Sequence, residues 1–242
     1  MPDRFPVTRL SAIVGTSSSN QEERTRAFEA LIAAYWMPVY KYVRIKWNKP
    51  SEDARDLTQG FFAEAMAKDF FARYDPSKAK FRTFLRTCLD GFVANENKAA
   101  GRKKRGGDAI FFSLDFDGAE EQLRGLKSPV VGAIDDYFEK EFARSVFSLA
   151  LESFRSQMLQ AGKEIHLKLF ERYILNNEED SPKLSYKVLA EEFGISTSDV
   201  TNYLAFGRRE FRRIILERLH ELTASDDEFR REARALLGVT PT

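Results

Sequence analysis

The chain has 242 residues, of which 43% are hydrophobic and 31% are charged, a balance typical of a globular protein with one large or two small domains. The formal net charge of +1 does not indicate a nucleic-acid binder, so only the distribution of charge can support that function. One cysteine, Cys88, excludes an intrachain disulfide framework, and two histidines with one cysteine exclude an ordinary zinc site.

Targeting and catalytic signals are lacking in the sequence. The first twenty residues have no apolar core of the secretory type, and no run approaches the roughly 20 apolar residues that span a bilayer, so we expect a cytoplasmic protein without membrane contact. No phosphate-binding loop and no nucleophile–base pair can be assembled. We therefore expect no enzyme, no catalytic residue, no metal and no cofactor. His166 is expected to be a packed helix residue.

The first half of the chain is predicted to be helical. Over residues 21–47, apolar side chains recur at three- and four-residue steps, which indicates one buried helical face. Pro38 lies inside this run and is expected to kink or divide the helix. A second helix is predicted over residues 51–70, with Ser51 as its cap. One long helix or two short ones are expected over residues 80–104.

The second half is also predicted to be helical. Helices are expected from about Ile134, over residues 163–176, and as two short helices after a loop at 176–183. No strand-like alternation persists anywhere, so the predicted fold class is all-α, with two helical domains joined by a linker. The predicted divisions are residues 1–105 for the first domain, 106–132 for the linker, 133–222 for a helix-turn-helix domain and 223–242 for a weakly packed tail.

Residues 186–204 have the layout of a helix-turn-helix. The small Ala190 lies where the two helices must approach closely. Gly194 occupies the turn, where a left-handed backbone is often required. Val200 is the apolar residue that seats the second helix on the first. An ordinary helical hairpin with a charged face is the alternative interpretation.

The second helix of this motif is predicted to begin with a capping box formed by Ser196 and Asp199. Its amino end is polar and precedes the basic run GRREFRR, an arrangement suited to the major groove and to phosphates. The residues expected at DNA are Thr197, Ser198, Thr201, Asn202, Arg208, Arg209, Arg212 and Arg213.

A second basic segment lies between residues 73 and 105, which contain ten Lys and Arg against three Asp and Glu. Phe81, Phe84 and Phe92 are interleaved with these cations, a combination typical of single-stranded DNA binding. The alternative places these rings in the core and leaves the basic run as solvated surface. The DNA-binding candidates here are Phe84, Asn95, Arg102, Lys103, Lys104 and Arg105.

These features together resemble the extracytoplasmic-function class of sigma-70 factors. The segment DARDLTQGFF, residues 53–62, is similar to the D-A-E-D-L-x-Q-E-x-F signature that this class uses to bind the polymerase clamp helices. The segment FRTFLRTCLDGFVANENKAAGRKKR is similar to the promoter-melting helix, and LSYKVLAEEFGISTSDVTNYLAFGRREFRR to the domain for the −35 element. The resemblance spans most of residues 24–103 and 134–219.

The resemblance implies a factor that catalyses nothing and lends sequence preference to RNA polymerase. By it, Asp53, Asp56 and Gln59 would contact core polymerase. The residues from Phe84 to Arg105 named above would engage the −10 element, and those of the helix-turn-helix the −35 element. The implied partners are core RNA polymerase and promoter DNA, with a Ser/Thr protein kinase and an anti-sigma factor as candidate regulators.

The clamp-binding signature departs from the family at two positions. Arg55 stands where an acid is usual, and Gly60 replaces another acid, so weaker binding to a basic polymerase surface is expected. Thr58 is expected at the edge of the polar face, within one turn of Arg55. Phosphorylation would add about −1.5 to −2 charges there. We therefore expect a phosphothreonine switch; the alternative is a threonine bonded to its own helix.

Two other classes of function remain open on the sequence. One is a helix-turn-helix regulator that binds duplex DNA without acting as a sigma factor. The other is an adaptor, similar to an anti-sigma factor, that works through protein contacts alone. The basic run at residues 102–105 and the arginines after Gly207 argue against the adaptor.

Overall fold

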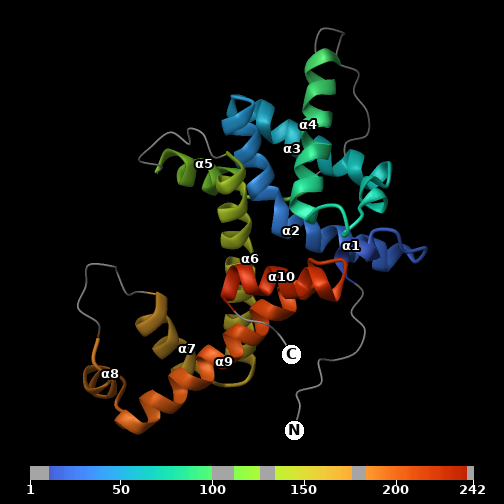
Figure 1. Cartoon of the computed structure of the whole chain (residues 1–242). Coiled ribbons are helices and arrows are strands. Elements are labelled where there is room, and N and C mark those ends of the chain that lie inside the picture. The colour runs from blue at the N-terminus through green and yellow to red at the C-terminus, as the bar shows by residue number, and fades with distance from the viewer. Residues whose placement is uncertain (1–10, 100–111, 126–133, 176–183, 239–242) are drawn as a thin grey trace. The chain divides into compact units, whose positions relative to one another are not determined.

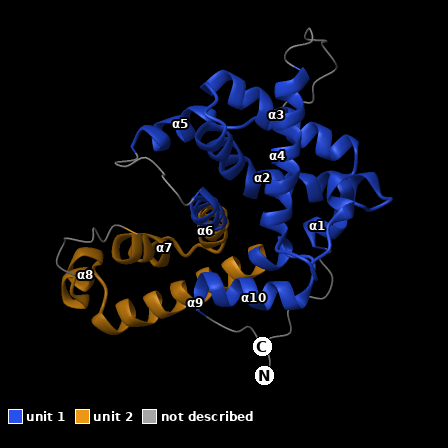
Figure 2. Cartoon of the chain, turned by 45° about the horizontal axis from the view of Figure 1, so that its top comes forward, with its two compact units in different colours: residues 1–146, 219–242 blue, residues 147–218 orange. Residues whose placement is uncertain are grey.

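The structure is a computed structural model that describes residues 11–99, 112–125, 134–175 and 184–238 (Figure 1). Every regular element in these ranges is helical, which confirms the all-α fold class. The chain separates into two compact units, residues 1–146 with 219–242, and residues 147–218 (Figure 2). The second unit therefore begins at residue 147, whereas the sequence predicted that the second domain begins at residue 133.

Unit 1 begins with α1 (Ala12–Gly15) and α2 (Gln21–Lys46). Helix α2 starts at the cap of Asn20, whose side chain accepts hydrogen bonds from two backbone amides of the first turn. Pro38 lies inside α2 without dividing it, so the expected division of this helix was wrong. An interior proline costs about 3 kcal/mol, and the fully buried aromatic face of the same helix, which includes Tyr35, outweighs this cost.

Helix α3 (Ser51–Ala67) and the 3₁₀ turn Phe70–Arg73 follow. Ser51 is the first residue of α3 rather than its cap, and its hydroxyl bonds to the Tyr40 hydroxyl at 3.0 Å. A single helix, α4 (Phe81–Ala99), then covers the described part of the basic segment.

The core of unit 1 is built largely from aromatic rings. The Tyr35 ring stacks on Phe142 with centroids 4.9 Å apart and meets Phe81 edge-on at 5.5 Å. Such pairs add to the stabilisation that burial alone gives. Other rings that are fully buried are Phe28, Tyr40, Tyr42, Phe61, Phe62 and Phe138.

Residues 106–132 were predicted to be a linker, but the structure forms a helix there, α5 (Phe116–Arg124), which packs within unit 1. Its Phe116 and Glu120 are buried, and the Glu120 carboxylate accepts hydrogen bonds from Tyr40 and Arg44, each at 2.5 Å. The Arg44 guanidinium lowers the pKa of Glu120 to about 2. The sequence showed no sustained period here because α5 is short and is held as much by these polar contacts as by apolar burial.

The prediction of a weakly packed tail over residues 223–242 was also wrong, because this segment forms α10 (Asp226–Leu237) and belongs to unit 1. Two of its acids, Glu228 and Glu232, are each only 2% exposed. The Glu228 carboxylate accepts hydrogen bonds from the Tyr74 hydroxyl at 2.7 Å and from the Phe81 amide at 3.2 Å. Charged residues that looked solvent-facing in the sequence therefore hold α10 in place.

Helix α6 (Ile134–Gln160) begins in unit 1 and ends in unit 2. Unit 2 continues with α7 (Glu164–Phe170), a π-helical turn (Glu171–Leu175) and α8 (Tyr186–Phe193). Helix α9 (Thr197–Glu221) has 25 residues and is not the short helix that was expected. Within the described ranges, no helix has both the length and the apolar content to span a membrane.

Candidate nucleic-acid interface

Helices α8 and α9 are joined by a tight turn at Gly194. The side chain of Ser185 caps the start of α8 by accepting from the Val188 amide at 3.3 Å. At the other end, Gly194 has φ +64°, a left-handed conformation that glycine adopts without strain. The Ile195 amide then bonds to the Ala190 carbonyl at 3.0 Å and closes the turn.

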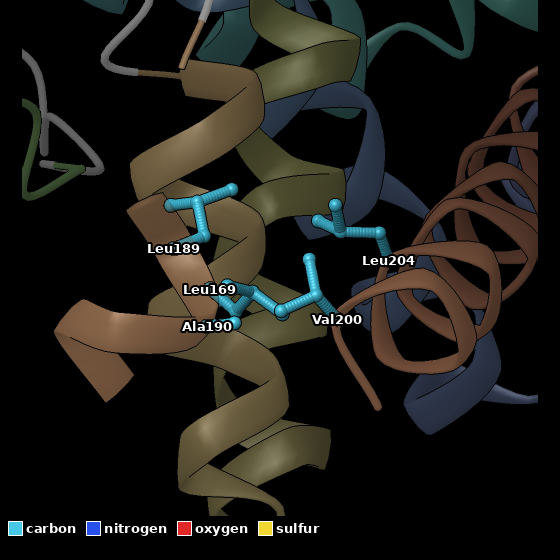
Figure 3. Packing of buried hydrophobic residues seen from close by; sticks show 5 residues of the cluster. All are labelled: Leu169, Leu189, Ala190, Val200 and Leu204. Atoms are coloured by element: carbon cyan, nitrogen blue, oxygen red, sulfur yellow. The ribbon is translucent and has the colours of Figure 1, made fainter. Parts of the chain in front are cut away.

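A small apolar core fixes α9 against α8 and α7 (Figure 3). Val200 and Leu204, one turn apart on α9, are both fully buried. They meet Leu189 and Ala190 of α8 and Leu169 of α7. Ala190 and Val200 thus lie in the core, as their positions in the sequence predicted.

The predicted capping box at the start of α9 is confirmed. The Ser196 hydroxyl accepts from the Asp199 amide at 3.1 Å, and the Asp199 carboxylate accepts from the Ser196 amide at 3.2 Å. Both orphan donors are therefore satisfied, and the first turn of α9 is well defined. The acid also suits the positive end of the helix dipole.

The polar residues predicted to read DNA lie on the exposed side of α9. The four at its amino end are solvent-exposed, and so are three arginines two to three turns further along. Arg213 differs, because its guanidinium donates to Glu210 at 3.0 Å, to Glu217 at 2.5 Å and to Gln157 at 2.9 Å. The prediction that Arg213 contacts a phosphate was therefore wrong. The exposed residues are Thr197, Ser198, Thr201, Asn202, Arg208, Arg209 and Arg212.

Helix α4 of unit 1 carries the other predicted DNA surface. Phe81 is buried, while Phe84 is half-buried and packs on Phe81 and Tyr74 with centroids 6.2 and 5.4 Å apart. Asn95 is exposed. Residues 102–105, the basic run of Arg102, Lys103, Lys104 and Arg105, lie outside the described residues.

Two cations of α4 are structural rather than free for DNA. The Arg82 side chain is 5% exposed and pairs with Glu139 at 2.6 Å and with Glu232 at 2.8 Å. The Arg86 guanidinium pairs with Asp135 at 2.7 Å. The cation excess of this segment therefore overstates the positive charge that its surface presents.

The acids predicted to contact polymerase lie on α3, where Asp53 and Asp56 are exposed and Gln59 is half-buried. Next to them, Arg55 forms an ion pair with Asp117 of α5, and its guanidinium lies over the Phe116 ring. The chain thus places a carboxylate of its own beside the arginine that replaces an acid. The sequence could not show this pairing, because 62 residues separate the two partners.

Thr58 does not lie at the edge of the polar face, which corrects its predicted position. Its side chain is 0% exposed, and its hydroxyl donates to the Ala54 carbonyl at 2.7 Å. A threonine bonded back to its own helix is the alternative considered above. A kinase cannot reach this hydroxyl while α3 is folded in this way.

The sequence did not single out Lys163 and Phe206, which contact each other near the middle of α9. The Lys163 ammonium lies 3.8 Å from the centroid of the Phe206 ring. His166 is a packed helix residue, as the sequence predicted, because its ring stacks on Tyr203 with centroids 3.8 Å apart. Burial and the nearby Lys163 charge lower the pKa of His166.

Comparisons of the chain with protein-family models, with curated proteins and with solved structures found no significant match. Among the described residues, no group of three or more His, Cys, Asp and Glu side chains is placed to hold a metal ion.

Proposed function

We propose that the protein is a sigma factor, which binds core RNA polymerase and directs it to promoter DNA. The observation that carries the proposal is the geometry of α8, Gly194 and α9. It supports a DNA-binding helix-turn-helix whose second helix presents a polar amino end followed by exposed arginines.

Within this proposal, the two ends of the exposed face of α9 have different tasks. Thr197, Ser198, Thr201 and Asn202 lie at the amino end, the part of such a helix that reaches base edges in the major groove. Arg208, Arg209 and Arg212 follow and would contact phosphates, which fix the position of the helix without reading sequence.

The polymerase-binding part of the proposal rests on α3. Asp53 and Asp56 are exposed carboxylates suited to a basic partner surface. The charge of Arg55 opposes such a partner less than the sequence suggested, because Asp117 neutralises it. Phosphorylation of Thr58 is no part of the proposal, since its hydroxyl is buried and bonded within α3.

A second candidate is a regulator that binds duplex DNA and does not act as a sigma factor. The same observation favours it, because a helix-turn-helix occurs in both classes. The exposed acids of α3 favour the sigma factor, because that function gives them a polymerase contact and the regulator assigns them none.

Capture of core RNA polymerase separates these two candidates. Immobilised wild type, Asp56→Ala and a control, Glu29→Ala, would be incubated with core enzyme; Glu29 is an exposed acid on α2, outside the signature segment. The proposal predicts that wild type and the control retain core and that Asp56→Ala retains less. If wild type retains none and still shifts duplex DNA alone, the regulator is the correct assignment.

A further inference from the structure

Two cations share one aromatic ring near the middle of α9. The Lys163 ammonium is 3.8 Å from the Phe206 centroid, and the Arg209 guanidinium carbon is 5.3 Å from the same centroid. In the part of the chain that the structure describes, no carboxylate lies within 4.0 Å of the Lys163 ammonium. The nearest acid pair of Arg209 is with Glu210, at a long 3.7 Å.

The backbone fixes where Lys163 is held. Helix α6 ends at Gln160 and is followed by a left-handed Gly162, with φ +65°, and the Lys163 amide bonds to the Met158 carbonyl at 2.8 Å. This closed turn delivers the lysine to the start of α7. The residue is half-buried, and its ammonium lies over the face of the Phe206 ring, which is a cation–π contact.

Close packing of α7 on α9 keeps this arrangement rigid. A Cβ at Gly207 would lie 2.9 Å from Cδ2 of Phe170, which means that the two helices touch at this point. One turn away, His166 of α7 stacks on Tyr203 and meets Phe206 edge-on at 5.4 Å. The start of α7 is therefore a fixed flank of α9.

This flank lies on the face of α9 that carries a predicted base-reading residue. Asn202, Phe206 and Arg209 are separated by four and three residues and so lie along one face of the helix. His166 adds little positive charge near neutral pH, because burial and Lys163 lower its pKa. The positive charge of the flank comes from Lys163 and Arg209.

We propose that Lys163 and Arg209 form a two-cation site for a backbone phosphate of duplex DNA, shared between the start of α7 and the middle of α9. The site rests on the proposed function and deepens it, because through this site α7 would help to position α9 in the major groove. Lys163 has no carboxylate within 4.0 Å among the described residues, and Arg209 has only the long contact to Glu210, so the N–H groups of both can turn to one phosphate. Such a contact is independent of sequence and sensitive to salt.

The site predicts a specific change in the salt dependence of DNA binding. Each phosphate contact contributes about 0.9 to the slope of log K against log salt concentration. Lys163→Ala is therefore expected to reduce the magnitude of that slope by at most about one, because Arg209 still faces the same phosphate, and to weaken binding equally across sequences. Lys163→Arg keeps the charge beside the ring and is expected to retain the wild-type slope.

The experiment uses the full-length chain and a fluorescently labelled pool of random-sequence duplex oligonucleotides, with anisotropy measured over a series of KCl concentrations. The matched control is Lys168→Ala, which removes an exposed lysine of α7 whose one ion pair among the described residues is with Glu164, at 4.0 Å. The expected result is a lower slope for Lys163→Ala alone, with thermal unfolding unchanged.

Equal slopes for wild type and Lys163→Ala would overturn the site and leave the proposed function intact. Equal losses in Lys163→Ala and Lys168→Ala would also overturn it, because diffuse charge would then explain both. No binding of the duplex pool by wild type at the lowest KCl concentration would overturn the site as well; if wild type also fails to bind core polymerase, the proposed function fails with it.

Discussion

Replacement of Gly207 by alanine tests the contact that holds α7 against α9. The added Cβ would lie 2.9 Å from Cδ2 of Phe170, whereas ordinary contacts begin near 3.4 Å, so the helices or the ring must shift by about half an ångström. The ring has little room, because Phe154 and Phe211 pack on it at 4.8 and 5.3 Å. Overpacking of this kind costs about 1–3 kcal/mol.

The helix propensity of alanine acts in the opposite direction, by about 1 kcal/mol. Gly91→Ala is the matched control, since nothing lies within 4 Å of its Cβ and it should show the gain alone. The free energies of unfolding of the two variants should therefore differ by about 1–3 kcal/mol, or about 2–12 °C in Tm for a chain of this size.

Hydrogen exchange resolved by segment is the suitable assay, because two compact units need not unfold in one step. Gly207→Ala should lower the protection of amides in α7 and in the middle of α9, and Gly91→Ala should leave both unchanged. If Gly207→Ala gains as much stability as Gly91→Ala does, the close approach of α7 and α9 is refuted.

Three further predictions concern unit 1. Arg44 lowers the pKa of Glu120 from 4.5 to about 2, so this pair stabilises the folded protein fully at a pH above 4.5. As the pH falls from 4.5 to about 2, up to about 3 kcal/mol of the free energy of unfolding is lost, and Glu120→Gln should flatten this loss when denaturation is measured over a pH series. Glu232→Ala leaves Arg82 with one carboxylate and should cost about 2 kcal/mol in thermal unfolding; an unchanged Tm would contradict the buried pairing. Thr58→Glu buries a charge and should abolish exchange protection in α3; a folded variant that binds polymerase more tightly would instead restore the phosphorylation hypothesis.

The fold class and the turn between α8 and α9 could be predicted because their signals are local. Gly194 marks a left-handed turn, and Ser196 with Asp199 marks a helix start within four residues. Ala190 and Val200 follow from helical spacing alone. Each of these features depends on neighbours in the sequence, so a single sequence is enough to predict it.

The features that the sequence did not predict depend on partners far apart in the chain. Glu228 and Glu232 look like surface residues until Tyr74 and Arg82 are placed beside them, more than a hundred residues away. The buried position of Thr58 likewise depends on which face of α3 its neighbours cover, and the polar type of the residue gave the wrong indication.

The same reason applies to the candidate DNA surface. The charge count over residues 73–105 could not separate Arg82 and Arg86, which are held in ion pairs, from the cations that remain exposed. Lys163 was missed because it lies 43 residues from Phe206 and matches no motif.

Transcription by purified core RNA polymerase from the organism that encodes the chain tests the sigma assignment most directly. The template would be a pool of genomic fragments from that organism, and the 5′ ends of the transcripts would be mapped with and without the protein. The account predicts discrete new 5′ ends that appear only with the protein and that weaken with Asp56→Ala. Identical 5′ ends with and without the protein, together with binding of the protein alone to duplex DNA, would contradict it.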